Sequence, residues 1–294
     1  MQIRQPIVAG RFYPSDRSEC RAAVTACLRD AAARPSAGYR AVGGIVPHAG
    51  WICSGAVAAE VIAALLRDAQ PETVVIFGAV HHRPGRCASV YARGAWQTPL
   101  GMVTIDEDLA REIVAGSPLL ADDAASHVRE HSIEVQVPIV QAVAPDVRIL
   151  PIMVPPLSSA TQVGERVAET VGRVGRRVVY LGSTDLTHYG PSYAFTPEGH
   201  GQAGIRWAKE INDRRLLERV ERLEAEGIVP EAVEHQNACG PGAVAAAIAA
   251  SRVAGATRAR ILRHTNSYEV LCDRFGDMED AVGYAGVLFE APLA

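Results

Sequence analysis

The chain has 294 residues, of which 48% are hydrophobic and 21% charged, a composition typical of a globular protein with ample core-forming material. This composition excludes a chain that is mainly disordered, collagen-like or of low complexity. The 29 basic and 33 acidic residues are interspersed and leave a net charge of −4, which disfavours a nucleic-acid-binding protein.

Short β-branched or apolar runs alternate along the chain with longer segments rich in Ala, Leu, Arg and Glu. In chain order, the pattern predicts a helix at 16–33, a strand at 41–46, a helix at 54–69, a strand at 73–80, a helix at 106–115, a strand at 149–154, a helix at 158–174, a strand at 177–181, helices at 203–226 and 242–253, and a strand at 281–289. This alternation is typical of the α/β class. With no repeat or linker, we expect a single domain over residues 1–294, with a mixed or mostly parallel central sheet and helices on both faces.

Targeting segments and cysteine spacing bear on the location of the protein and on the role of its cysteines. No apolar run approaches the roughly 20 residues that cross a bilayer, and the first residues contain no apolar signal segment, so we expect a cytoplasmic protein without a membrane partner. The six cysteines are spread along the chain with no CxxC pair. This spacing indicates neither a disulfide framework nor a zinc ribbon.

Polar side chains follow three predicted strands, in GGIVPHAGW, VVIFGAVHH and VVYLGSTDLTHYG. Ligands of α/β proteins bind outside the carboxyl ends of the strands. We therefore expect His48, His81, His82, Asp185 and His188 to lie on one rim of one sheet. Adjacent side chains in extended backbone point in opposite directions, so only one of His81 and His82 can face a given site.

Each of these residues also has an ordinary structural interpretation. His48 can be a loop histidine bonded to backbone, and Asp185 can cap a short helix with His188 as its neighbour. Alternatively, Asp185 and His188 are three residues apart, so the imidazole can act as an acid/base or substrate-orienting group whose tautomer the carboxylate sets. His131 and Glu134 lie at the start of an apolar segment, where they can support a site or merely begin a solvated helix.

Cys239 precedes the alanine-rich run 243–250 and so lies at a predicted helix N-terminus. Free amides and the helix dipole favour a thiolate there, although a buried inert cysteine is the usual alternative. Nucleophile-elbow, P-loop and dinucleotide-binding motifs are absent from the sequence. Two imidazoles plus one sulfur on one rim favour a metal site with room for water or substrate. The sulfur raises the affinity for copper(I) or zinc relative to a carboxylate.

The sequence resembles the Memo family, whose prokaryotic members are called AmmeMemoRadiSam system protein B. The motifs that carry the resemblance are AGRFYP (9–14), PHAGW (47–51), GAVHH (78–82), EHSIE (130–134), STDLTHYG (183–190) and NACGP (237–241). The resemblance implies a fold similar to that of class III extradiol dioxygenases. It also implies a metal site formed by His48, His81 and Cys239, with Asp185 and His188 beside it.

From this resemblance we expect a mononuclear redox-metal site, with iron(II) favoured over copper(I) or zinc, in an oxidoreductase of dioxygenase-like ancestry. The family name also implies a functional link to radical SAM and AMMECR-type proteins. Two alternatives belong to other classes. One is a copper- or iron-buffering protein without turnover, and the other is a peptide- or protein-binding module that uses Phe12, Trp51 and Tyr189 as aromatic walls.

Overall fold

The computed structural model describes residues 2–82 and 85–293. The strands are β1 (Ile3–Arg4), β2 (Tyr39–Val46), β3 (Thr73–Gly78), β4 (Ala88–Val90), β5 (Ala95–Thr98), β6 (Gly101–Thr104), β7 (Leu120–Asp122), β8 (Arg148–Met153), β9 (Val178–Ser183), β10 (His188–Tyr189), β11 (Arg258–Asn266) and β12 (Ala281–Pro292). The α-helices are α1 (Arg17–Leu28), α2 (Trp51–Ala69), α3 (Glu107–Ala115), α4 (Val137–Val143), α5 (Ala160–Val174), α6 (Gln202–Trp207), α7 (Arg214–Glu221), α8 (Ala225–His235), α9 (Pro241–Val253) and α10 (Ser267–Phe275). A π-helix covers Ala208–Asp213, and short 3-10 helices cover Ser126–Arg129, Glu134–Gln136 and Pro191–Tyr193.

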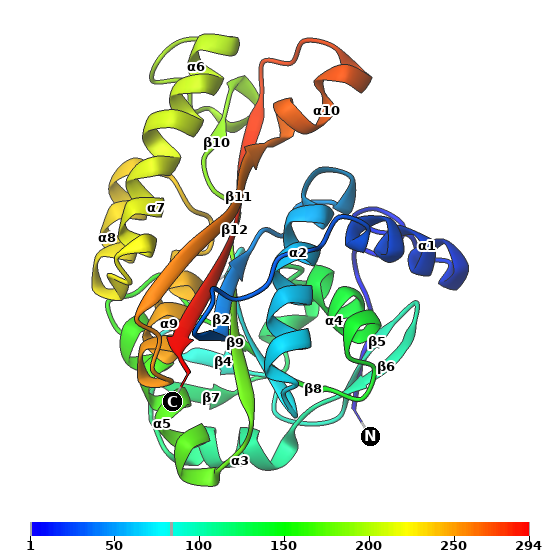
Figure 1. The fold of residues 1–294 in the computed structure, drawn as a ribbon, viewed down its shortest axis with the longest axis vertical. Coiled ribbons are helices and arrows are strands. Elements are labelled where there is room, and N and C mark those ends of the chain that lie inside the picture. The colour runs from blue at the N-terminus through cyan, green and yellow to red at the C-terminus, as the bar shows by residue number, and fades with distance from the viewer. Residues whose placement is uncertain (1, 83–84, 294) are drawn as a thin grey trace.

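A nine-stranded sheet forms the centre of the molecule, in the order β10-β12-β2-β9-β3-β8-β4-β7 with β11 paired to β12 (Figure 1). The four neighbours β2, β9, β3 and β8 run parallel, whereas β12 is antiparallel to β2 and β4 is antiparallel to β8. A separate three-stranded sheet has the order β1-β5-β6. The expected α/β class with a mixed sheet is therefore confirmed.

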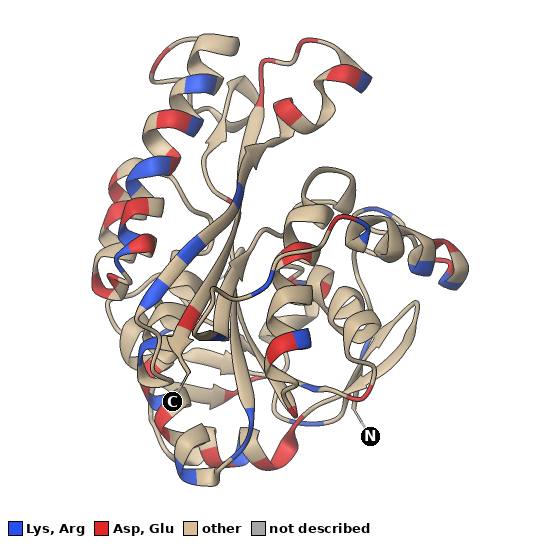
Figure 2. Ribbon diagram, in the orientation of Figure 1, with Lys and Arg blue, Asp and Glu red and all other residues tan. Residues whose placement is uncertain are grey.

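Helices cover both faces of the central sheet. On one face α2 packs on β2 and β12, with α1 and α4 beside it (Figure 1). On the other face α9 packs on β9, β2 and β3, flanked by α5 and α8. Almost every residue of α9 is buried, because its small alanines let the helix lie close to the sheet. Charged residues recur along the outer helices and along β11 (Figure 2). In the described part of the chain, no helix combines the length and apolarity needed to span a membrane.

The predicted single helix at 203–226 is wrong. It is divided into α6, the π-helix and α7, and it ends before Leu223, whose φ of 55° is left-handed. The π-helix brings the buried carboxylate of Asp213 to the loop that follows β9. There Asp213 accepts hydrogen bonds from the backbone N–H and the hydroxyl of Thr187. A local helical pattern contains no information about this long-range contact, so the sequence predicted an unbroken helix.

Candidate metal centre

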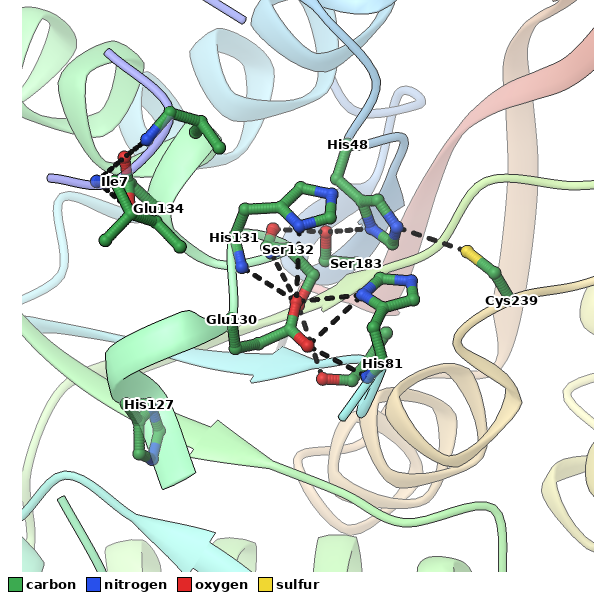
Figure 3. Close-up of polar contacts among 12 residues, drawn as sticks. Ile7, His48, His81, His127, Glu130, His131, Ser132, Glu134, Ser183 and Cys239 are labelled. Carbon is green, nitrogen blue, oxygen red and sulfur yellow. Dashed lines mark hydrogen bonds and ion pairs between the residues drawn. The ribbon is translucent and has the colours of Figure 1, made fainter. Parts of the chain in front are cut away.

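Three neighbouring strands bring the predicted polar residues together at their carboxyl ends. His48 lies two residues beyond β2, Asp185 two residues beyond β9, and His81 three residues beyond β3. Because β2 and β3 both run parallel to β9, these ends share one edge of the sheet. Helix α9 packs on β9, and the loop before it brings the Cys239 sulfur to 3.1 Å from Nε2 of His48 (Figure 3).

The hydrogen bonds around His48 determine which ring nitrogen carries the proton. The ring is buried, and Nδ1 lies 3.0 Å from the hydroxyl oxygen of Ser183. That hydroxyl donates its proton to the Ser132 carbonyl, so its oxygen can only accept from Nδ1. Nε2 therefore has a free lone pair, and it points toward Cys239. Burial, together with the nearby rings of His81 and His131, lowers the pKa of His48 well below its ordinary value.

Cys239 has a different electrostatic environment from the one predicted. Burial and the nearby Asp185 carboxylate raise the pKa of its thiol, which opposes the effect of the helix N-terminus. The backbone N–H of Asp185 still donates to the sulfur at 3.2 Å. The next residue must be glycine, because a Cβ on Gly240 would lie 2.5 Å from the Ser183 carbonyl oxygen. The close approach of this loop to β9 depends on that missing side chain.

His81 is oriented by Glu130, a residue that the sequence analysis did not single out. The carboxylate lies 3.0 Å from Nδ1 of His81 and also accepts the backbone N–H groups of His81, His131 and Ser132 (Figure 3). Since a carboxylate only accepts, Nδ1 carries the proton and Nε2 is left with a lone pair. Burial alone would lower the pKa of His81, but Glu130 outweighs it and raises the pKa. His82 is exposed.

Two compact groups of possible metal donors occur among the described residues, and both contain His48. One consists of His48, His81 and His131, and the other of His48, Asp185 and Cys239. In each group, one donor atom per residue lies within 4.8 Å of the others. The predicted trio of His48, His81 and Cys239 takes members from both groups. His131, expected to be at most a supporting residue, is a member of the first group.

Glu134, three residues after His131, makes structural contacts with the N-terminal segment. Its buried carboxylate forms an ion pair with Arg4 at 2.8 Å and accepts the hydroxyl of Tyr13 and the backbone N–H of Val8. These contacts attach the N-terminal segment to the segment that carries Glu130. The sequence offered no signal for this pairing, because its members are far apart along the chain.

Asp185 is a member of the second donor group, and His188 follows it by three residues on the same strand-end loop. Asp185 is buried and accepts the backbone N–H of His48 at 2.7 Å, which holds the two strand-end loops together. Burial raises the pKa of Asp185. Nδ1 of His188 lies 3.1 Å from the Leu186 carbonyl, so this carbonyl sets the tautomer, and the expectation that Asp185 does so is corrected. Tyr193 packs edge-on against the His188 ring.

The aromatic residues considered as cleft walls are packed mostly into the core. Trp51 is buried and lies 5.1 Å from Tyr13, centroid to centroid, and Tyr189 is fully buried. Phe12 is half-buried and packs edge-to-face on His131, with centroids 4.9 Å apart. An aromatic cleft for peptides is therefore not formed by Trp51 and Tyr189.

An open cavity borders the centre on the side of His81. Its volume is about 800 Å³, and its lining residues are His81, His82, Asp123, Ala125, Ser126 and Arg129. The His81 side chain is 27% exposed, so solutes in the cavity can reach it. A small molecule thus has a route to the donor group from solvent.

Comparison with known proteins agrees with the motifs. A family model described as Memo-like protein matches residues 4–288. The chain belongs to the Memo family. A MEMO1 family protein of Methanopyrus kandleri is 36% identical, over 97% of this chain and 98% of that protein. A MEMO1 family protein of Pyrococcus abyssi is 37% identical, over 97% of this chain and 99% of that protein.

A solved structure supports the fold of this Memo-like chain. An uncharacterized protein from Escherichia coli K12 matches with a TM-score of 0.51, over 84% of this chain and 99% of that one. Its sequence identity is 13%, so the likeness concerns the fold alone. The chain thus combines Memo family membership with His/Cys groups that could hold a metal ion.

Proposed function

We propose that the chain binds one redox-active metal ion through His48, His81 and Cys239 and uses it in an oxidoreductase reaction of dioxygenase-like ancestry. The observation that carries the proposal is the 3.1 Å contact between the His48 lone pair and the Cys239 sulfur. In the metal-free chain a thiol proton occupies this contact. An ion that binds there displaces the proton, which couples metal binding to proton release.

His48 and Cys239 fit such an ion. Bonds of about 2.1 Å to nitrogen and 2.3 Å to sulfur separate the two donor atoms by about 3.6 Å at a tetrahedral angle. The observed separation of 3.1 Å needs only a small opening to reach this value. His81 adds a second imidazole whose Nδ1 is held by a carboxylate, an arrangement common among metal-ligating histidines.

The donor set suits iron(II), copper(I) or zinc, and we favour iron(II). When bound, iron(II) would supply one-electron redox chemistry with open coordination positions. The chain's own residues would prepare the substrate. The cavity beside His81 admits it, and His188 can accept a proton at Nε2, because its Nδ1 proton is held by the Leu186 carbonyl. Asp185 keeps the loops of His48 and Cys239 together.

Anaerobic purification followed by elemental analysis tests the metal site. We expect about one ion per chain, and His48→Ala, His81→Ala and Cys239→Ser should each lower affinity by more than the roughly 10–100-fold typical of outer-shell substitutions. His82→Ala, which alters an exposed neighbour, should retain the metal and is the matched control. Unchanged metal content in all three ligand variants would refute the site.

Oxygen consumption with a panel of catechols then tests the reaction. His188→Ala should keep the metal and lower any turnover by roughly 10²–10⁴-fold, the range for a lost general acid or base. If this variant loses its metal as His48→Ala does, His188 is a ligand and our assignment is wrong. Rapid metal exchange without substrate-dependent oxygen uptake would instead identify a metal-buffering protein.

A further inference from the structure

His131 brings a third imidazole to the metal centre. Its ring centroid lies 5.5 Å from that of His48 and 5.0 Å from that of His81, and the latter two are 5.2 Å apart. The side chain of His131 is 22% exposed, so the ring lies at the edge of the site rather than in the core. The three rings come from three loops, and one donor nitrogen of each lies within 4.8 Å of the others (Figure 3).

These ring spacings match the geometry that one ion would impose on three imidazoles. A nitrogen–metal bond of about 2.1 Å places each ring centroid about 3.2 Å from the ion, and tetrahedral angles then separate the centroids by about 5.2 Å. The observed separations of 5.0, 5.2 and 5.5 Å lie around this value. The planes of the His81 and His131 rings are 12° apart, so at least one of these two rings must rotate before both can share the ion.

The position of His131 is held from two sides. Its backbone N–H donates to the Glu130 oxygen that also accepts Nδ1 of His81, so one carboxylate sets the placement of both histidines. Phe12 packs edge-to-face on the His131 ring. The ring's own Nδ1 is 3.8 Å from Glu130, beyond hydrogen-bond distance. The ring is thus oriented by packing while its nitrogens stay available.

His48 is shared by the two donor groups but can serve only one ion. Its Nδ1 proton is donated to Ser183, which leaves the single lone pair on Nε2. An ion on this lone pair can complete its shell with the sulfur of Cys239 or with the two other imidazoles. The two groups are therefore alternative or combined shells of one ion, not two separate sites.

We propose that His131 is a metal ligand, and that the imidazoles of His48, His81 and His131 retain a divalent ion when the Cys239 sulfur is unavailable. This inference rests on the proposed metal-binding function and adds a nitrogen-only binding mode to it. Three neutral imidazoles suit zinc or iron(II) better than copper(I), which prefers sulfur. Oxidation or alkylation of Cys239 would then change the preferred metal without emptying the centre.

Cobalt(II) titration of the purified metal-free chain separates the two modes, because cobalt(II) bonded to a thiolate absorbs strongly in the near ultraviolet and cobalt(II) bonded to imidazole does not. We expect the unmodified chain to show the thiolate band. Cys239→Ser and Cys239→Ala should lose the band and still bind cobalt(II), with a lower affinity than the unmodified chain. Adding His131→Ala to Cys239→Ser should lower the affinity at least a further 10–100-fold. Adding His82→Ala instead should change nothing.

The inference is overturned if Cys239→Ser with His131→Ala binds cobalt(II) as tightly as Cys239→Ser alone. It is also overturned if both single Cys239 variants fold, as judged by circular dichroism, but bind no cobalt(II). If Cys239→Ser with His131→Ala does not fold, the same comparison is made between Cys239→Ala alone and Cys239→Ala with His131→Asn. Failure of the proposed metal-binding function would give a different result from failure of this inference. In that case His48→Ala would bind cobalt(II) as tightly as the unmodified chain.

Discussion

Replacing Glu130 with Gln should weaken both the fold and the metal centre. The carboxylate is 2% exposed; one oxygen accepts the N–H groups of His131 and Ser132 and Nδ1 of His81, and the other accepts the His81 backbone N–H. Although burial alone would raise it, the contacts with His81 and the backbone donors lower the pKa of Glu130, so it is charged. A Gln side chain has one oxygen and one NH₂ group. Whichever way the amide is turned, its NH₂ group then faces at least one of the N–H groups that the carboxylate accepts.

Leaving one buried donor without an acceptor costs about 1–3 kcal/mol, so the free energy of unfolding of the metal-free variant should fall by that amount. Loss of the group that orients His81 should lower metal affinity by about 10–100-fold. Urea denaturation measures the first effect and metal titration the second. Glu112→Gln, an exposed position on α3, is the control. If Glu130→Gln matches this control in both measurements, the carboxylate neither supports the loop nor orients His81, and our reasoning is wrong.

Two further predictions concern packing and pH. Gly240→Ala should lower the free energy of unfolding by about 1–3 kcal/mol and weaken metal binding, because the added Cβ overlaps the Ser183 carbonyl and displaces Cys239. An unchanged urea midpoint together with an unchanged metal titration would contradict this prediction. Burial lowers the pKa of His127 to about 4. As the pH falls below about 6.5, His127 is protonated in the unfolded chain but stays neutral in the folded chain, so the free energy of unfolding decreases. Between pH 7 and pH 5 this contribution is about 2 kcal/mol, and His127→Gln should lose that much less stability in urea denaturation over this interval; an identical pH dependence would refute the assignment.

Strand periodicity placed part of the site correctly from the sequence. The runs before His48, His81 and Asp185 are continuous apolar segments, and such runs form buried parallel strands whose carboxyl ends share one edge. Proline at position 47 and small residues around these positions end each run at a definite point. Local pattern and the rules of α/β architecture were therefore sufficient to bring three residues to one rim.

Local reasoning failed where long-range burial outweighs local electrostatics. A helix N-terminus favours a thiolate at Cys239, yet the surrounding core and Asp185 raise the pKa of the thiol. The same failure affected Trp51 and Tyr189, which were considered as cleft walls and are packed in the interior. Burial is a property of the assembled fold, and no window of sequence contains it.

The sequence by itself determined the α/β class, the family, and the rim that carries His48, His81 and Asp185, because these follow from periodicity and short motifs. Only the tertiary structure decided that Glu130 orients His81 and that His131 completes a group of three imidazoles. Those contacts join segments about 50 positions or more apart, and their partners are chosen by loop placement and side-chain rotamers. Such choices depend on the packing of the whole molecule, which the order of residues along one segment does not specify.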